Sequence, residues 1–164
     1  MKKFLSFVRN LFAIRAVGKI DIFLSLFLAV IVGTLATELV NFLIRRMPQN
    51  VPEGLEMANE VLRNADGYLL LTFLFSVCIF APIVEEVIFR GILWWPIERF
   101  LSSNVALVVT SILFALAHVD FLHIVAVFPL GLLFGFLRKR TNSIWPAIIA
   151  HAANNTMASL SLIF

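Results

Sequence analysis

Three short polar motifs interrupt the apolar stretches of this sequence. They supply carboxylate, guanidinium, imidazole and carboxamide groups, the acids, bases and hydrogen-bond donors of hydrolytic enzymes. An ionisable side chain inside a lipid-spanning segment costs about 2.5 to 3.5 kcal/mol on insertion scales and is usually functional. The motif residues are, in chain order, Glu85, Glu86, Arg90, Phe114, His118, His151 and Asn155.

Spacing within the first motif separates the two glutamates. Residues four apart on a helix share a face, whereas adjacent residues point about 100° apart. Glu86 can therefore pair with Arg90, which lies four residues later. Glu85 is left without a local cation, so it is the better candidate for a catalytic base.

The same rule groups the residues of the other two motifs. His151 and Asn155 present an imidazole and a carboxamide one helical turn apart, aimed at one point. Phe114 lies one turn before His118 and can pack its ring against that imidazole.

These groups suit hydrolysis of a peptide bond. The reaction needs a base that activates water and donors that stabilise the oxyanion. Glu85 with His118 can activate the water, and His151 with Asn155 can supply the donors. We expect these four residues to converge inside the bilayer around a water-accessible pocket, because lined cavities admit water at membrane depth.

The motifs Glu-Glu-x-x-x-Arg, Phe-x-x-x-His and His-x-x-x-Asn, in this order, resemble those of the CAAX protease and bacteriocin-processing family. These are intramembrane proteases related to the type II CAAX prenyl protease. The resemblance runs from Glu85 to Asn155. It implies an all-helical membrane fold and a glutamate-type mechanism with the four roles given above. It also implies that Glu86 and Arg90 are structural or substrate-orienting.

Two other classes of function remain open. Glutamates and histidines of this set could hold Zn²⁺ for a metal-dependent intramembrane protease, although the helical His-Glu-x-x-His signature is absent. We expect no metal or other cofactor, with zinc as the alternative. The protein could instead be a non-catalytic immunity or scaffold protein, or its polar residues could line a proton or ion path.

Composition places these motifs in a membrane protein. The chain has 164 residues, 61% hydrophobic and 14% charged, against about 45 to 50% and 25% in soluble domains. About 20 apolar residues span the hydrocarbon core. We predict an all-α polytopic bundle of about five transmembrane segments, with a break at Ala81-Pro82 in the second. The predicted segments are 20–44, 68–100, 105–119, 124–137 and 144–164.

The basic residues indicate topology. Residues 1–19 have the period of a basic amphipathic helix, which we expect to lie on the membrane surface. Residues 20–164 then form one transmembrane domain, with the family-like core at 68–164. The loop 45–66 is expected to be aqueous, with a short helix. The positive-inside rule puts the N-terminus and Arg138–Arg140 on the cytoplasmic side of the inner cell membrane.

Partners follow from the same features. The net charge of +3 is clustered at segment ends, which suits a lipid bilayer and not nucleic acid. The expected substrate is a membrane-associated peptide or protein, and a homodimer or a partner membrane protein could complete its cavity. Gly131 and Gly135 predict a close helix contact. We interpret His123 as interfacial and Asn154 as a helix-packing residue.

Overall fold

The apolar stretches of the sequence form helices. The computed structural model describes residues 13–46, 53–64 and 66–163, and these ranges contain no strand. The predicted all-α class is therefore confirmed. The helices are α2 (Lys19–Arg46), α3 (Glu53–Asn64), α4 (Gly67–Phe75), η2 (Ser76–Phe80), α5 (Ala81–Glu86), η3 (Val87–Ile92), α6 (Trp94–Phe100), α7 (Ser103–Leu116), α8 (Phe121–Thr141) and α9 (Trp145–Ile163).

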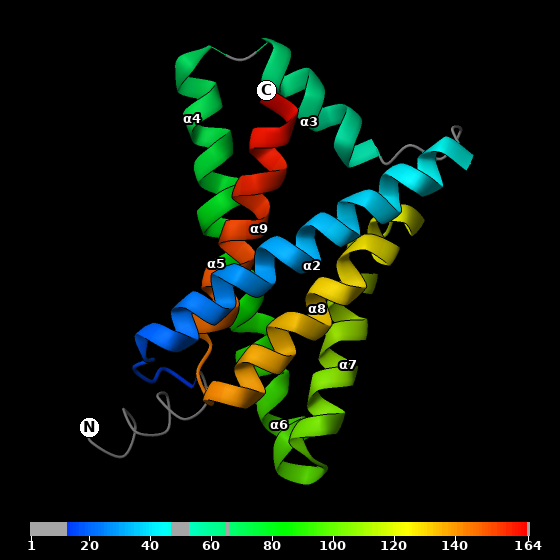
Figure 1. Ribbon diagram of the computed structural model, residues 1–164. Coiled ribbons are helices and arrows are strands. Elements are labelled where there is room, and N and C mark those ends of the chain that lie inside the picture. Colours follow the sequence, from blue (N-terminus) through cyan, green and yellow to red (C-terminus); the bar gives the residue numbers. More distant parts are fainter. Residues whose placement is uncertain (1–12, 47–52, 65, 164) are drawn as a thin grey trace.

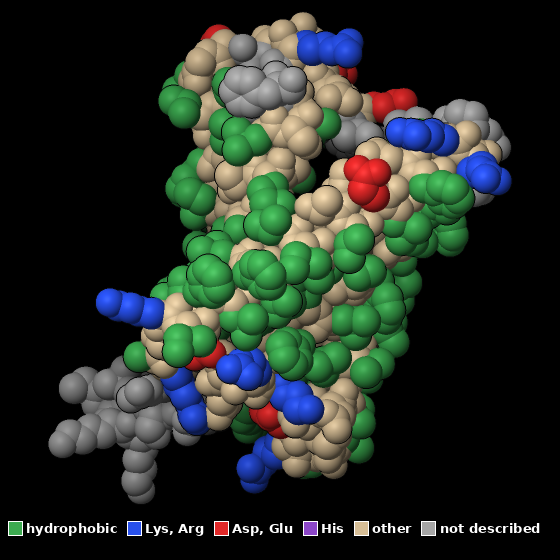
Figure 2. Space-filling view, in the orientation of Figure 1, with side chains coloured by type: hydrophobic (Ala, Val, Ile, Leu, Met, Phe, Trp, Pro, Cys, Tyr) green, Lys and Arg blue, Asp and Glu red, His purple; other side chains and the backbone are tan. Residues whose placement is uncertain are grey.

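Several helices are suited to lipid. Within the described residues, α2, the continuous run 67–100 and α8 are long and apolar enough to cross a membrane, and α7 is a shorter apolar helix. Apolar side chains cover the middle of the face drawn in Figure 2, while Lys, Arg, Asp and Glu gather toward its two ends. The predicted helical membrane bundle agrees with this arrangement.

Helix α2 lies across α8 and α9 (Figure 1). The residues that it buries are all small, namely Ser25, Ala29, Gly33 and Ala36. Small residues at this spacing let helix backbones approach closely, which is the common packing mode within membranes. Large apolar residues on its other faces, such as Phe23 and Leu35, are exposed. Helix α2 thus presents a narrow small-residue face inward and an apolar face to lipid.

Helix α8 occupies the centre of the bundle and packs closely on α7. A Cβ added at Gly131 would lie 3.3 Å from the Cα of Ser111, and one added at Gly135 would lie 3.1 Å from the Cγ of Leu107. Both glycines therefore face α7, and the close helix contact that the sequence predicted is confirmed. The apolar core formed by α8 also includes Phe114 of α7 and small residues of α2 and α9.

The run 67–100 stays helical where the sequence predicted a break. Instead of breaking, it changes hydrogen-bond register in two π-helical segments, η2 and η3, on either side of α5. In the first of them, the Ala81 N–H bonds the carbonyl of Ser76, five residues earlier. A π-helical turn accommodates a residue that disturbs the α-helical ladder, and Pro82, which has no N–H, follows directly.

Polar residues begin three of the helices. Asp66 accepts a hydrogen bond from Leu69 N (2.7 Å), Ser102 from Val105 N (3.2 Å) and Asp120 from His123 N (3.0 Å). Each side chain satisfies a backbone donor that a helix leaves free in its first turn. The short helix expected between residues 45 and 66 is α3.

The segment before α2 is not helical where it is described. Residues 13–18 form a turn and a connection without regular secondary structure, so the predicted amphipathic helix does not reach Lys19. Its residues 1–12 lie outside the described part. Ser143 donates to the carbonyl of Arg15 (2.8 Å), and Arg140 pairs with Asp21 at 3.6 Å. The start of α2 and the end of α8 therefore share one end of the molecule.

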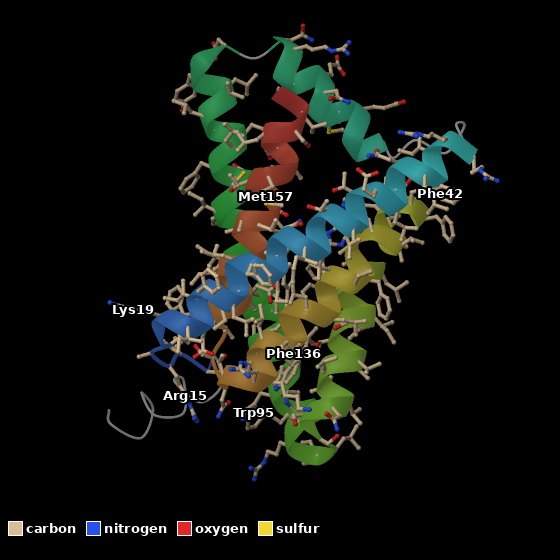
Figure 3. All side chains as sticks on the ribbon, viewed as in Figure 1. Arg15, Lys19, Phe42, Trp95, Phe136 and Met157 are labelled. Carbon is tan, nitrogen blue, oxygen red and sulfur yellow. The ribbon has the colours of Figure 1, made fainter. Side chains whose placement is uncertain are left out.

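Figure 3 shows the same end with Arg15, Lys19 and Trp95 gathered near it, whereas Phe42 lies toward the other end of α2. Arg15 and Lys19, near the start of α2, therefore lie at the same end of the bundle as Arg140, near the end of α8. This is the arrangement that the positive-inside rule requires if both segments face the cytoplasm.

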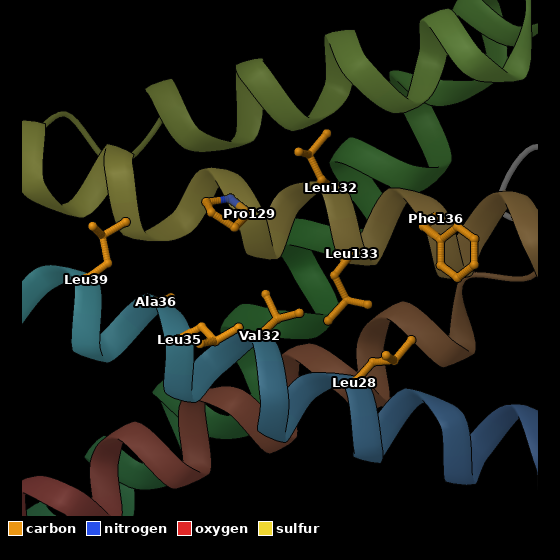
Figure 4. A pocket seen from close by; sticks show the side chains of 9 residues that line it. All are labelled: Leu28, Val32, Leu35, Ala36, Leu39, Pro129, Leu132, Leu133 and Phe136. Atoms are coloured by element: carbon orange, nitrogen blue, oxygen red, sulfur yellow. The ribbon is translucent and has the colours of Figure 1, made fainter.

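A groove of about 560 Å³ runs between α2 and α8 (Figure 4). Its lining is apolar and consists of Leu28, Val32, Leu35, Ala36, Leu39, Pro129, Leu132, Leu133 and Phe136. The groove offers no acid, base or hydrogen-bond donor side chain, and none of the motif residues lines it. The groove is therefore separate from the candidate site.

Candidate active site

The buried pair Glu86 and Arg90 anchors the candidate site. Both side chains are fully buried, and Arg90 Nη1 lies 3.2 Å from Glu86 Oε1, as the spacing predicted. Arg90 Nη2 also donates to the carbonyl of Gly131 at 2.7 Å. The guanidinium carbon lies 4.6 Å from the centroid of the Phe114 ring. A buried ion pair needs such additional partners to offset the cost of desolvation.

His151 lies between the two glutamates. Its Nδ1 is 3.1 Å from Glu86 Oε1, and its Nε2 is 3.7 Å from Glu85 Oε2. The ring stacks on Phe134 at a centroid distance of 4.7 Å and meets the edge of Phe114 at 5.5 Å. With Nδ1 bonded to Glu86, the imidazole is held with Nε2 toward Glu85.

Glu85 differs from its neighbour in environment. Its side chain is 31% exposed, whereas that of Glu86 is fully buried. Glu85 Oε2 is nevertheless a buried atom without a hydrogen-bond partner among the described residues. A buried acceptor of this kind is costly unless a water or ligand group satisfies it, and such exceptions often mark functional sites.

His118 lies in the turn that follows α7 and not within the helix. Its Nδ1–H donates to the carbonyl of Phe114 at 2.9 Å, which leaves Nε2 as the nitrogen available to accept a proton. Its ring meets Phe114 at 5.1 Å and His123 at 4.6 Å. The next residue, Val119, has a φ of 61°, a conformation that is rare for a β-branched residue.

Phe114 connects the two histidines. Its ring contacts both His118 and His151, and it is almost fully buried. In the described part of the chain, Glu85 forms its close imidazole contact with His151 and forms no ion pair with His118. The sequence had suggested the pairing of Glu85 with His118. The tertiary contact of Glu85 with His151 was not foreseen.

Asn155 shares a face of α9 with His151, as predicted. Its Nδ2 donates to the backbone carbonyl of Val77 at 3.0 Å. A carboxamide nitrogen carries two N–H groups, so one donor is engaged with the backbone and the other remains. The neighbouring Asn154 points its Nδ2 toward Asn155 Oδ1 at 3.4 Å.

Three further residues support the site without a sequence signal for that role. Phe134 is the stacking partner of His151, and nothing in its apolar context distinguishes it. Arg138 was assigned to the cytoplasmic boundary, yet it is buried and its Nε donates to the carbonyl of Arg90 at 3.1 Å. Gly33 of α2 lies against the carboxamide of Asn154.

The described residues do not contain a group of three or more His, Cys, Asp and Glu side chains placed to hold a metal ion. A catalytic zinc site normally uses three protein ligands. Zinc stays the alternative to a metal-free mechanism.

The fold and the site together define a helical membrane protein in which Glu86, Arg90 and His151 are buried in contact with one another. Residues 67–157, more than half of the chain, match the family model described as type II CAAX prenyl endopeptidase Rce1-like. The chain belongs to this family of membrane CAAX peptidases.

Two curated relatives are similar to the chain. The putative membrane peptidase YdiL of Bacillus subtilis is 36% identical over 48% of the chain and 32% of the relative. The membrane-embedded CAAX protease MroQ of Staphylococcus aureus is 33% identical over 51% of the chain and 36% of the relative. The aligned regions therefore span about a third of each relative's length. No solved structure matches the chain.

Proposed function

We propose that this protein is an intramembrane peptidase that hydrolyses a peptide bond of a membrane-associated protein or peptide. The observation that carries the proposal is the Glu85 carboxylate, which has a buried oxygen without a partner among the described residues and lies 3.7 Å from His151. Family membership and the apolar surroundings of the site support the same conclusion.

In the proposed reaction, Glu85 and His118 activate a water molecule. The carboxylate takes a proton from the water, and the hydroxide oxygen attacks the scissile carbonyl carbon. The carbonyl oxygen becomes an oxyanion, which the remaining N–H of Asn155 and the Nε2–H of a doubly protonated His151 stabilise, since the Nδ1–H of His151 already donates to Glu86. The C–N bond then breaks, and the proton held by the site passes to the leaving amine.

The orientation of the reacting groups depends on three neighbouring side chains, Glu86, Arg90 and Phe114. Glu86 holds His151 through Nδ1, and Arg90 holds Glu86. Phe114 shields one side of each imidazole from water, because its ring packs against both of them. Preorganised donors in a dry site are worth about 3 to 4 kcal/mol each in the reaction barrier.

The test compares wild-type protein with Glu85→Gln in the native host, with membrane-peptide fragments identified by mass spectrometry. A peptidase should lose its products in Glu85→Gln while the protein still inserts. The matched control is Glu38→Gln, an exposed glutamate on α2. Identical fragments in wild type and Glu85→Gln would refute the proposal, and a phenotype that survives Glu85→Gln without cleavage would favour a scaffold.

The zinc alternative has a separate test. If zinc takes part, chelator-treated purified protein should lose peptidase activity and recover it when metal is added. Unchanged activity after chelation would remove this alternative.

Substrate and location follow the chemistry of the site and the family. The candidate substrate classes are peptide precursors such as bacteriocins and membrane-anchored sorting signals, with prenylated C-termini ranked last. A multi-pass location in the inner cell membrane with a cytoplasmic N-terminus is supported by the basic residues at one end of the bundle. A homodimer or a partner membrane protein that completes the substrate cavity is also part of the proposal.

A further inference from the structure

The carbonyl of Val77 has lost its helical donor. In the π-helical segment η2, Ala81 N–H bonds the carbonyl of Ser76, five residues earlier. The next donor in this register would be residue 82, which is a buried proline without an N–H. The free acceptor is satisfied by the side chain of Asn155, whose Nδ2 lies 3.0 Å from Val77 O. Buried backbone carbonyls need such a partner.

This contact fixes the plane of the Asn155 carboxamide. One N–H points to Val77 O, and Oδ1 receives the long hydrogen bond of 3.4 Å from Asn154. Because the amide is planar, these two contacts also fix the direction of its second N–H. The second N–H is the donor that the proposed mechanism uses, so its direction depends on Val77 and Asn154.

Gly33 holds Asn154 from the other side. A Cβ added at Gly33 would overlap Asn154 Oδ1 and lie 3.5 Å from its Cγ. Glycine at this position therefore lets α2 approach α9 closely enough to confine the carboxamide of Asn154. A methyl group would displace the end of a side chain and not a backbone, so the fold should tolerate it while the carboxamide moves.

We propose that Gly33 and Pro82 are positioning residues that orient the Asn155 carboxamide, Gly33 through Asn154 and Pro82 through the freed carbonyl of Val77. The inference rests on the proposed peptidase function for its kinetic consequence. It makes α2, which lies outside the residues 67–157 matched by the family model, part of the catalytic assembly.

The first test observes the carboxamide directly. In protein labelled with ¹⁵N-asparagine in detergent micelles, the two side-chain amide protons of Asn155 are assigned by their loss in Asn155→Asp. We expect one of them to exchange slowly with solvent, and both signals to shift in Gly33→Ala and in Pro82→Ala. Gly67→Ala is the matched control, since nothing lies within 4 Å of a Cβ at that position. Unshifted Asn155 signals in Gly33→Ala and Pro82→Ala would overturn the proposal.

The second test is kinetic and uses a synthetic copy of a peptide that is cleaved by wild type and not by Glu85→Gln. Gly33→Ala should lower kcat about tenfold or more with little change in KM, because misplacement by about 1 Å of a positioned group can cost about a hundredfold. In an Asn154→Ala background, Gly33→Ala should have little further effect, because its route to Asn155 has been removed. If Gly33→Ala lowered kcat equally in the wild-type and Asn154→Ala backgrounds, Gly33 would not act through Asn154.

The two tests separate the inference from the proposed function. A wild-type protein without Glu85-dependent cleavage would refute the peptidase function, and the ¹⁵N signals would still decide whether Gly33 and Pro82 orient Asn155. If Glu85-dependent cleavage is present and the Asn155 signals and kcat are unchanged in both variants, the positioning inference fails and the peptidase function stands.

Discussion

At the scale of single residues, the site is organised around buried charge. Glu86 and Arg90 are fully buried and 3.2 Å apart, and His151 adds a second contact to the same carboxylate oxygen. An unpaired charge in such a place is far more costly than the intact pair. Loss of the Arg90 charge should therefore affect both the stability of the protein and the orientation of His151, because the Glu86 carboxylate contacts both side chains.

Replacing Arg90 by methionine should therefore destabilise the protein by about 3 to 5 kcal/mol, since Glu86 is left buried without its cation. The double variant Arg90→Met with Glu86→Leu should recover much of the lost stability, because no buried charge remains. Thermal unfolding midpoints in detergent micelles measure both. Activity should stay low in the double variant, since His151 has lost the acceptor for Nδ1. A double variant that is less stable than Arg90→Met would contradict this account.

At the scale of the elements, close helix contacts decide where the site residues stand. Gly131 brings α8 against Ser111 of α7, and its carbonyl also receives Arg90. Glu85 and Glu86 of α5, which follows the register change in η2, both lie close to His151 of α9. The position of the acids therefore depends on helix geometry on both sides of the site.

The two glycines of α8 should respond differently to alanine. A Cβ at Gly131 would press on the Cα of Ser111 at 3.3 Å, which moves only if the helix moves, whereas a Cβ at Gly135 would meet the Leu107 side chain at 3.1 Å. Gly131→Ala should cost about 1 to 3 kcal/mol through overpacking, and Gly135→Ala should cost less. The comparison uses thermal unfolding midpoints of the two variants in the same detergent. A larger loss of stability in Gly135→Ala than in Gly131→Ala would contradict this prediction.

At the scale of the whole molecule, the charged ends and apolar middle set the orientation in the membrane. Arg140 and Asp21 join the end of α8 to the start of α2, and Tyr68 at the start of α4 is 82% exposed. Figure 1 shows the α3–α4 region at the opposite end from the α8–α9 connection. These two ends should therefore face opposite sides of the membrane.

Cysteine labelling tests this orientation. The chain has one cysteine, Cys78, so a Cys78→Ser background accepts single reporters. With a cytoplasmic N-terminus, a membrane-impermeant maleimide added to intact cells should label Tyr68→Cys and not Lys139→Cys. Permeabilised cells provide the control, in which both positions should react. Labelling of Lys139→Cys in intact cells with Tyr68→Cys protected would invert the proposed topology.

The sequence was sufficient for much of this description. Hydropathy predicted the helices, because lipid demands long apolar segments with internally bonded backbones. Helical spacing predicted the pairing of Glu86 with Arg90 and the shared face of His151 and Asn155, because these are contacts within one turn of a helix. A small-residue pattern predicted a close helix contact at Gly131, and the structure shows that the partner is α7.

Tertiary structure decided the contacts between helices. The approach of Glu85 to His151, the bond from Asn155 to Val77 and the position of Gly33 against Asn154 all join residues far apart in the chain. Local periodicity carries no information about such distances, since rotation and crossing of each helix depend on the packing of all its neighbours. The identities of the reactive groups are therefore local properties of the sequence, whereas their mutual geometry belongs to the folded bundle.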